Sequence, residues 1–197
     1  MRARTTGGLL ACVVLVSLFT GAASGSPPSA GGAAKALYTK LLRTPYAKSE
    51  LPAGFTSATI SRTATSNNST KYHATGLVGV QYFGGPDVAD VVIYYVFPTA
   101  ADAHGDLTHP NTSSGDSHPA GKVPGISEPS LLVNGSITGK NSAGKTVTNG
   151  ITGAAAQSGT VIVAAATVSD KKTTSGNLPE AVALLKSALA HLAAVQP

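Results

Sequence analysis

The sequence predicts an α+β fold: a single domain with a mainly antiparallel sheet of about six strands, packed by an N-terminal, a middle and a C-terminal helix. Two observations predict it. Strand-like segments follow one another in two groups of three, with no helical segment inside either group. Helical segments open the domain, separate the two groups and close the chain. Because strands that follow each other directly favour antiparallel pairing, one curved sheet carrying helices is favoured over a doubly wound sheet.

The first 24 residues have the pattern of a secretory signal peptide. Arg2 and Arg4 give a positive start, residues 9–19 form a short apolar run, and small residues follow at 21–24. The apolar run is well short of the roughly 20 residues that a membrane span requires. We therefore expect cleavage after Ser24, export to the extracellular space or cell envelope, and no membrane attachment afterwards.

Lipidation of Cys12 is the alternative, because residues 9–12 (LLAC) resemble a bacterial lipoprotein box. In such a box the cysteine closes the apolar run, whereas here residues 13–16 (VVLV) continue it. We therefore interpret Cys12 as part of the apolar run of a cleaved signal peptide.

Composition limits the chemistry of the processed chain. Residues 25–32 (GSPPSAGG) offer nothing to pack and predict a flexible leader, which places the single domain at 33–197. The one Cys and the one Met lie in the signal segment, and the chain has no Trp. The domain therefore has no disulfide, thiolate metal site or cysteine nucleophile. An exported protein also lacks a steady supply of ATP or reduced nicotinamide, so we expect no cofactor.

The charge of the chain argues against nucleic acid as a partner. The formal net charge is +5, and Arg2 and Arg4 of the signal segment contribute to it. This excess is too mild to indicate nucleic-acid binding. Aromatic residues interleaved with Lys or Arg, which proteins use to hold single strands, are also missing.

The domain opens with a predicted helix and a predicted strand. Ala33, Leu37 and Leu41 recur at helical spacing, and Pro45 ends this short helix. Alternating small polar and apolar residues at 57–63 predict the first strand.

The strongest strand predictions come next. Residues 72–83 and 88–97 are rich in Val, Tyr, Ile and Phe, and the turn-forming GGPD sequence at 84–87 joins them, which predicts an antiparallel hairpin. Residues 91–96 (VVIYYV) are apolar at every position. Such a strand is expected in the centre of the sheet, covered on both faces.

A short helix is predicted between the two groups of strands. Thr99 followed by Asp102 is a plausible N-terminal cap, Gly105 weakens the helix and Pro110 stops it. The polar stretch at 111–129 predicts a long loop.

The second half of the domain predicts three strands and a final helix. The strands are expected at 131–138, 145–155 and 160–168. Asn177 and Glu180 form a capping pair at the start of the helix. Its apolar face is expected to contain Val182, Leu185, Leu189 and Leu192.

One motif matches a phosphate-binding loop. Residues 139–146 (GKNSAGKT) fit the pattern of Gly, four residues, Gly, Lys and Ser/Thr, which works only between a strand and a helix N-terminus. The next residues, 146–152 (TVTNGIT), are β-branched and contain an Asn-Gly pair. We therefore predict a hairpin loop rather than a nucleotide site.

The only other candidate site is a cluster of His and Asp that runs from the middle helix into the long loop. Imidazole and carboxylate groups suit zinc or copper. The cluster contains Asp102, His104, Asp106, His109, Asp116 and His118. The candidate metal ligands among them are His104, Asp106, His109 and His118.

Helical spacing limits this metal hypothesis. Asp102, Asp106 and His109 are spaced to share one face of a helix, and His104 points away from it. A site would therefore require the loop that carries His118 to fold back. The alternative is that these residues form a solvated polar loop without a metal.

The sequence supports no catalytic residue. No serine lies in a Gly-x-Ser-x-Gly elbow. Glu50 and Glu128 are the glutamates not explained by capping, and nothing in the sequence brings them together. For His73 and His191 a structural role is the better interpretation.

Residues 91–103 (VVIYYVFPTAADA), with the later strand at 160–168 and the terminal Ala/Leu-rich helix, resemble secreted sensor-like domains of actinobacteria, of the receptor-kinase extracellular-domain and lipoprotein type. The resemblance implies a non-enzymatic extracellular domain of antiparallel α/β/α shape that binds an unidentified small molecule or protein partner. The alternative is an extracellular metal-binding protein or hydrolase that uses residues 102–118. A binding module predicts an apolar cleft between sheet and helix, whereas an enzyme or metal site predicts histidines that converge with carboxylates.

Overall fold

The computed structural model of the chain describes residues 31–63, 74–87, 89–109, 118–140, 145–169 and 176–196. The predicted signal peptide, most of the predicted leader, His73 and Asp116 lie outside these ranges.

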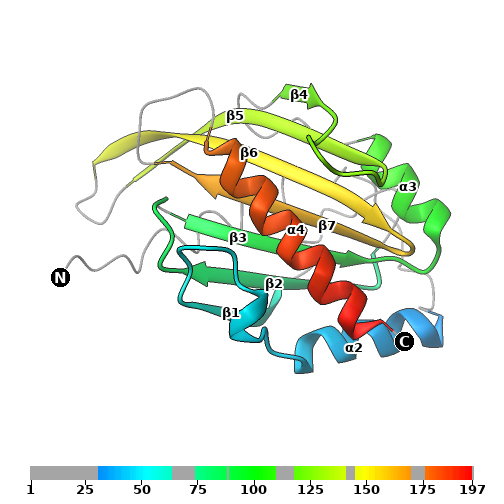
Figure 1. The fold of residues 1–197 in the computed structure, drawn as a ribbon. Helices are drawn as coiled ribbons and strands as arrows, with labels where there is room; N and C mark the ends of the chain where they lie inside the picture. The colour runs from blue at the N-terminus through cyan, green and yellow to red at the C-terminus, as the bar shows by residue number, and fades with distance from the viewer. Residues whose placement is uncertain are drawn as a thin grey trace.

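Helices and strands follow one another in the predicted order, and the α+β class is confirmed (Figure 1). The elements are α2 (Gly32–Arg43), the short 3-10 helix η1 (Lys48–Glu50), β1 (Ser57–Thr63), β2 (Gly76–Phe83), β3 (Ala89–Val96), α3 (Ala100–Thr108), β4 (His118–Gly121), β5 (Ser130–Lys140), β6 (Thr146–Ser158), β7 (Val161–Val168) and α4 (Leu178–Val195).

The sheet has seven strands rather than about six, because β4 lies in the segment that was expected to be a loop. All four residues of β4 are exposed, and one of them is Pro119. A short edge strand of this kind has no buried face, so it shows no alternation of apolar and polar residues.

The seven strands form one antiparallel sheet in the order β1-β2-β3-β7-β6-β5-β4. The chain builds β1 to β3 as one meander, crosses to the far edge through α3, and returns through β4 to β7. The two meanders join where β3 pairs with β7 along its whole length, from Ala89 opposite Val168 to Val96 opposite Val161. The β2–β3 hairpin and the central position of β3 are therefore confirmed, and all eight residues of β3 are buried.

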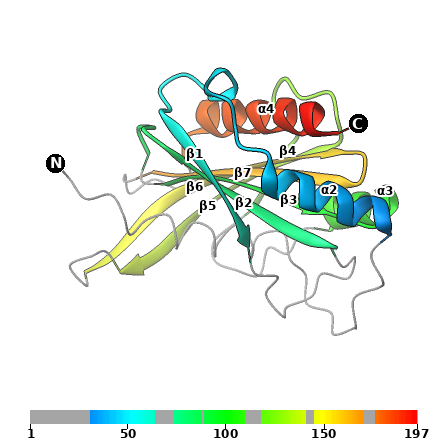
Figure 2. The same cartoon turned by 90° about the horizontal axis from the view of Figure 1, so that it is seen from below.

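The two faces of the sheet carry separate apolar cores. On β3, Val92, Tyr94 and Val96 face the core that α2 and α4 cover. Val91, Ile93 and Tyr95 belong to the opposite core, which α3 joins through Ala103 and Leu107. Figure 2 shows α4 on one side of the sheet with α2 beside it. The middle helix thus packs on the other face, against β5, β6 and β7.

Helix α4 crosses the sheet as a core helix. Its predicted cap is confirmed, because the Asn177 side chain accepts a hydrogen bond from the backbone N–H of Glu180. The buried face is rotated from the predicted one: Leu184 and Ala188 are fully buried, whereas Val182 and Leu189 are half-buried. By length and composition α4 could span a membrane, with a mean hydropathy of 1.4, but here its apolar side packs on the sheet.

The hairpin prediction for the motif at 139–146 is confirmed. Lys140 of β5 is paired with Thr146 of β6, and a strand of 13 residues follows where a nucleotide site would need a helix. Residues 141–144 lie outside the described ranges.

Candidate functional site

A surface cleft of about 550 Å³ lies between α3, β4 and the start of β5. This volume falls within the range of roughly 300–1,000 Å³ that is typical of small-molecule sites. The cleft is lined by His104, Leu107, Thr108, Pro119, Lys122, Ser127, Glu128, Pro129, Ser130 and Leu131. It therefore combines apolar side chains with several polar groups from three separate segments of the chain, 104–108, 119–122 and 127–131.

The apolar part of the cleft is continuous with the core of the domain. Leu107 is buried within the core on the α3 side of the sheet, and Leu131 packs against that core. Pro119 and Pro129 add apolar surface to the lining. Because these side chains are held by the core or by rigid prolines, the cleft is largely formed before any ligand arrives.

Gln157, at the end of β6, holds one side of the cleft in place. Its Nε2 donates hydrogen bonds to the carbonyls of Ala100, at 2.9 Å, and Gly159, at 3.1 Å. Its backbone N–H donates to the carbonyl of Pro129, at 2.9 Å. Two carbonyl acceptors on Nε2 fix the orientation of the amide, so Oε1 must point the other way.

The Gln157 amide determines which ring nitrogen of His104 carries the hydrogen. Its Nδ1 lies 3.1 Å from Oε1 of Gln157. An amide oxygen only accepts hydrogen bonds, so Nδ1 carries the hydrogen and, in the neutral ring, Nε2 carries the lone pair. His104 therefore brings a hydrogen-bond acceptor to the lining of the cleft.

Two opposite charges line the same cleft. The Ser127 hydroxyl donates to Oε2 of Glu128 at 2.9 Å. The backbone N–H of Glu128 and this hydroxyl both lower the pKa of the Glu128 carboxyl. Glu128 therefore brings a carboxylate to the cleft, and Lys122 brings an amino group to the same lining. In the described part of the chain no ion pair joins Lys122 to Glu128, and the recorded pair is that of His191 with Glu50.

Among the described residues, no three of the four predicted metal ligands lie close enough to share an ion. His104 lines the cleft and bonds Gln157, and His118 is exposed on β4. Nδ1 of His109, at the end of α3, lies 2.9 Å from the carbonyl of Gly105. Asp106 is only 3% exposed, and burial raises its pKa to about 7. Metal binding by these four residues stays a prediction.

Of Asp102, Asp106 and His109, which were expected to share one face of a helix, Asp102 and Asp106 lie four residues apart within α3 and His109 is its C-terminal cap. Asp102 belongs to the N-terminal cap, where the Thr99 hydroxyl donates to its carboxylate at 2.6 Å. Asp106 is buried, whereas His109 is exposed just beyond the last residue of the helix.

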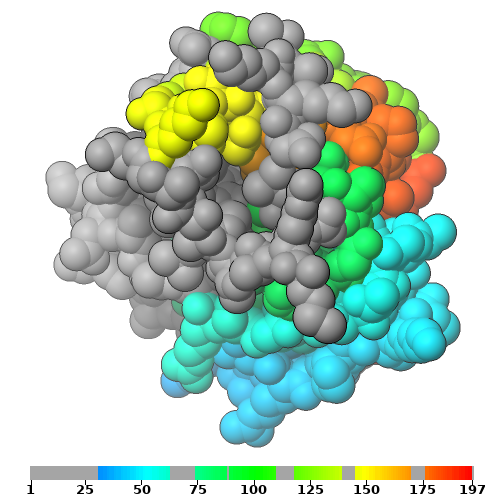
Figure 3. Space-filling view, turned by 90° about the vertical axis from the view of Figure 1, so that its left-hand side faces the viewer, coloured from blue at the N-terminus to red at the C-terminus, as the bar shows by residue number. Residues whose placement is uncertain are grey.

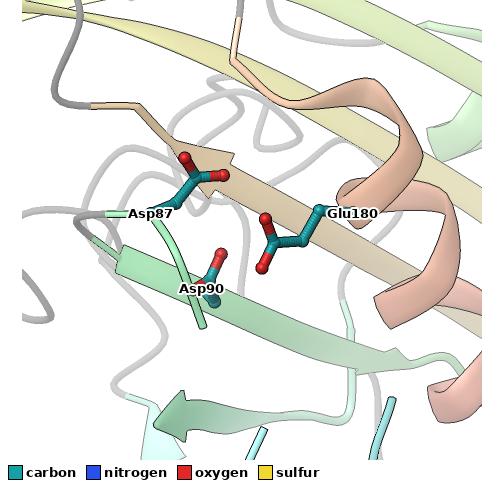
Figure 4. Close-up of side chains that lie close together, drawn as sticks. All are labelled: Asp87, Asp90 and Glu180. Atoms are coloured by element: carbon teal, nitrogen blue, oxygen red, sulfur yellow. The ribbon is translucent and has the colours of Figure 1, made fainter. Parts of the chain in front are cut away.

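A group of three carboxylates, which we call the acid cluster, lies at the start of α4. Its members are Asp87, which precedes β3, Asp90 of β3 and Glu180 of α4, and one oxygen from each lies within 4.8 Å of the others (Figure 4). Among the described residues it is the one group of three or more such side chains close enough to share a metal ion. Figure 3 views the end of the sheet at which α4 (orange) begins.

The repulsion between the carboxylates of the acid cluster can be relieved by a bound proton or by a bound cation. Glu180 is 9% exposed, and burial, followed by the charge of Asp90 and a hydrogen bond with Asp87, raises its pKa to about 8. The raised pKa favours the protonated form of Glu180, which can donate to a neighbouring carboxylate. Oxygen ligands of this kind also suit Ca²⁺ or Mg²⁺.

A third polar group is buried between η1 and α4. Nδ1 of His191 lies 3.1 Å from Oε1 of Glu50, and its ring stacks on Tyr46 at a centroid distance of 4.0 Å. Tyr94 donates its hydroxyl hydrogen to the carbonyl of Ala188 at 3.0 Å. Burial raises the pKa of Tyr94 well above its usual value, so the phenol stays neutral. These contacts join the 3-10 helix to α4, and they give His191 and Glu50 structural roles.

Sequence reasoning missed both Gln157 and the acid cluster. Gln157 follows three alanines in an apolar strand. Asp87 closes the GGPD sequence before β3, where polar residues are common, and Asp90 is the second residue of β3. Glu180 was identified only as a capping residue. No local pattern distinguishes these residues, because their partners come from distant parts of the chain.

Comparisons with known proteins add no assignment to these groups. The chain matches no family model, no curated protein and no solved structure.

Proposed function

We propose that this protein is an exported, non-enzymatic binding module that holds a small molecule in the cleft beside α3. The observation that carries the proposal is the cleft itself, a concave site of about 550 Å³ with apolar surface and a small number of polar groups. This combination is typical of ligand sites. A cleft of this kind favours a small molecule over a protein partner, which would need a broader surface.

The setting of His104 supports binding rather than catalysis. A histidine that activates a hydroxyl nucleophile must hydrogen-bond it and is itself oriented by a third group. In the described part of the chain, the recorded partner of the His104 ring is the amide of Gln157, and no hydroxyl bonds this ring. The lining thus offers hydrogen-bonding groups without a prepared nucleophile.

Export and a sensor-like role are supported by the sequence. Residues 1–24 have the pattern of a signal peptide, and residues 91–103 carry the resemblance to secreted sensor-like domains. In such a module the ligand would be met outside the cytoplasm.

Native mass spectrometry of the protein recovered from its host's culture medium or cell envelope tests the proposal. We expect a denatured mass that corresponds to cleavage after Ser24, and a native mass with a surplus from a small organic molecule. A chain that keeps its first 24 residues, or carries a lipid on Cys12, would contradict cleavage and release.

A blocking variant assigns the surplus to the cleft. Leu131→Trp places a large side chain among the lining residues and should abolish the surplus mass. Lys35→Gln, an exposed change on α2, is the control and should retain it. If no surplus mass is found, and a small-molecule library gives no thermal shift that Leu131→Trp removes, the proposed function is wrong.

A further inference from the structure

We infer that the ligand of the cleft is a small apolar zwitterion, either a free apolar amino acid or a dipeptide. This inference rests on the proposed function and adds the chemical class of the ligand. It follows from which charges line the cleft, which hydrogen-bonding groups accompany them, and what surface lies between.

The two charges in the lining favour a ligand that carries both a positive and a negative charge. Lys122 and Glu128 line one cleft, and in the described part of the chain they form no ion pair with each other. Both side chains are exposed, so a neutral ligand would leave the two charges in water and form no charged hydrogen bond with either. A ligand with a single charge would satisfy one group and be repelled by the other. A zwitterion supplies the opposite charge to each.

The polar groups of the cleft also form two sets, one that can accept hydrogen bonds from a ligand ammonium and one that can donate to a ligand carboxylate. Because Gln157 fixes the hydrogen of His104 on Nδ1, Nε2 can accept an N–H from a ligand ammonium, as can the Glu128 carboxylate. The Ser130 hydroxyl oxygen accepts the backbone N–H of Val123 at 3.3 Å, so its own hydrogen remains to donate. Ser130 and Lys122 can therefore both donate to a ligand carboxylate.

The remaining lining selects the side chain of the ligand. Leu107, Leu131, Pro119 and Pro129 give apolar surface in the same cleft. Burying an apolar side chain against them contributes about 25 cal/mol per Å² of surface removed from water. We therefore expect a preference for leucine-like over glycine-like ligands.

Isothermal titration calorimetry of the processed protein tests the charge requirement. L-leucine and L-leucyl-L-leucine are the probes, and the tighter of the two distinguishes a free amino acid from a dipeptide. We expect N-acetyl-leucine, which lacks the ammonium, and leucinamide, which lacks the carboxylate, each to bind about tenfold more weakly than leucine, since each loses a charged hydrogen bond. Glycine should also bind more weakly.

Two variants assign each charge to its partner. Glu128→Gln should remove the preference for leucine over N-acetyl-leucine, and Lys122→Gln should remove the preference over leucinamide. Lys35→Gln is the matched control outside the cleft and should leave both preferences unchanged. Circular dichroism and the unfolding midpoint check that each variant is folded.

Failure of this inference can be told apart from failure of the proposed function. If N-acetyl-leucinamide, which has neither charge, binds as tightly as leucine and Leu131→Trp abolishes binding, the ligand class is wrong while the cleft remains a binding site. The same conclusion follows if none of these probes bind and the native surplus mass belongs to a molecule without both charges. If nothing occupies the cleft at all, the proposed function is wrong.

Discussion

Nδ1 of His104 in α3 lies 3.1 Å from Oε1 of Gln157 at the end of β6, two residues that are 53 positions apart in the chain. Gln157 also holds the first residue of α3 and the segment at Pro129 by hydrogen bonds. One amide side chain thus positions a helix, a loop and the histidine of the cleft, although Gln157 itself is not part of the lining.

Gln157→Leu should weaken both the domain and the cleft. The substitution removes the hydrogen bonds to Ala100, Gly159 and His104 in one step. Hydrogen bonds of this kind contribute about 0.5–1.5 kcal/mol each to stability, and because all three are exposed to solvent we expect a loss in the lower part of their sum, about 1.5–3 kcal/mol, in a urea unfolding experiment. Nitrogen-15 spectra of the wild-type histidines should show His104 protonated at Nδ1 and unprotonated at Nε2. A His104 ring with the opposite tautomer would contradict the assigned orientation of the amide.

The sequence predicted what local chemistry determines. The caps at Thr99 and Asn177, the hairpin before β3 and the burial of β3 on both faces follow from neighbouring residues, and all are present. Propensity and periodicity carry this information because a cap or a turn is complete within a few residues. β4 was missed because pairing with β5, rather than its own composition, makes it a strand.

The candidate sites depend on contacts that local chemistry does not determine. Asp90 and Glu180 are neighbours only because β3 pairs with β7 and α4 crosses both strands. The cleft likewise needs α3 to pack near β4, across residues that were expected to form a loop. Strand order sets these distances, and strand order cannot be obtained from hydrophobic patterning alone.

Glu180→Gln should flatten the pH dependence of stability. Burial and the neighbouring Asp90 and Asp87 raise the pKa of Glu180 from 4.5 to about 8 in the folded protein. The folded state therefore holds a proton that the unfolded chain releases between these two values, so stability falls as the pH rises from about 4.5 to about 8. Glutamine cannot ionise and should reduce this fall. The measurement is the urea midpoint at pH 5, 6.5 and 8.

An exposed glutamate gives the control for this pH experiment. Glu128→Gln changes the same kind of side chain at a surface position, and its lowered pKa places its titration below this pH window. It should leave the slope between pH 5 and 8 unchanged. If Glu180→Gln and wild type lose stability equally over this range, Glu180 is ionised in the folded protein.

Gly176→Ala should be severely destabilising. A Cβ atom at this position would lie 2.7 Å from the backbone nitrogen of Thr152 and 2.7 Å from the carbonyl oxygen of Thr167. Because both atoms belong to paired strands, the clash cannot be relieved by rotating a side chain, and we expect a loss of at least about 2 kcal/mol. Gly32→Ala, where nothing lies within 4 Å of the added atom, is the control and should be neutral. Equal unfolding midpoints for the two variants would contradict the close approach of the Gly176 backbone to β6 and β7.

Asp106→Asn tests whether Asp106 is a metal ligand or only a buried carboxyl group. Burial raises the pKa of Asp106 from 3.8 to about 7, and its Oδ2 has no hydrogen-bond partner among the described residues. The folded state therefore retains a proton that the unfolded chain loses, and stability should fall as the pH rises from about 4 to about 7. Asparagine, which carries no charge at any of these pH values, should remove the Asp106 contribution and leave the Glu180 contribution between about pH 4.5 and about 8. The pH profile is measured by urea unfolding.

Zinc titration of the wild type and the variant by calorimetry distinguishes a metal ligand from a buried carboxyl. If Asp106 is a ligand, the wild type binds zinc and Asp106→Asn binds it more weakly. If Asp106 is only a buried carboxyl, the two proteins behave alike toward zinc and differ in their pH profiles alone.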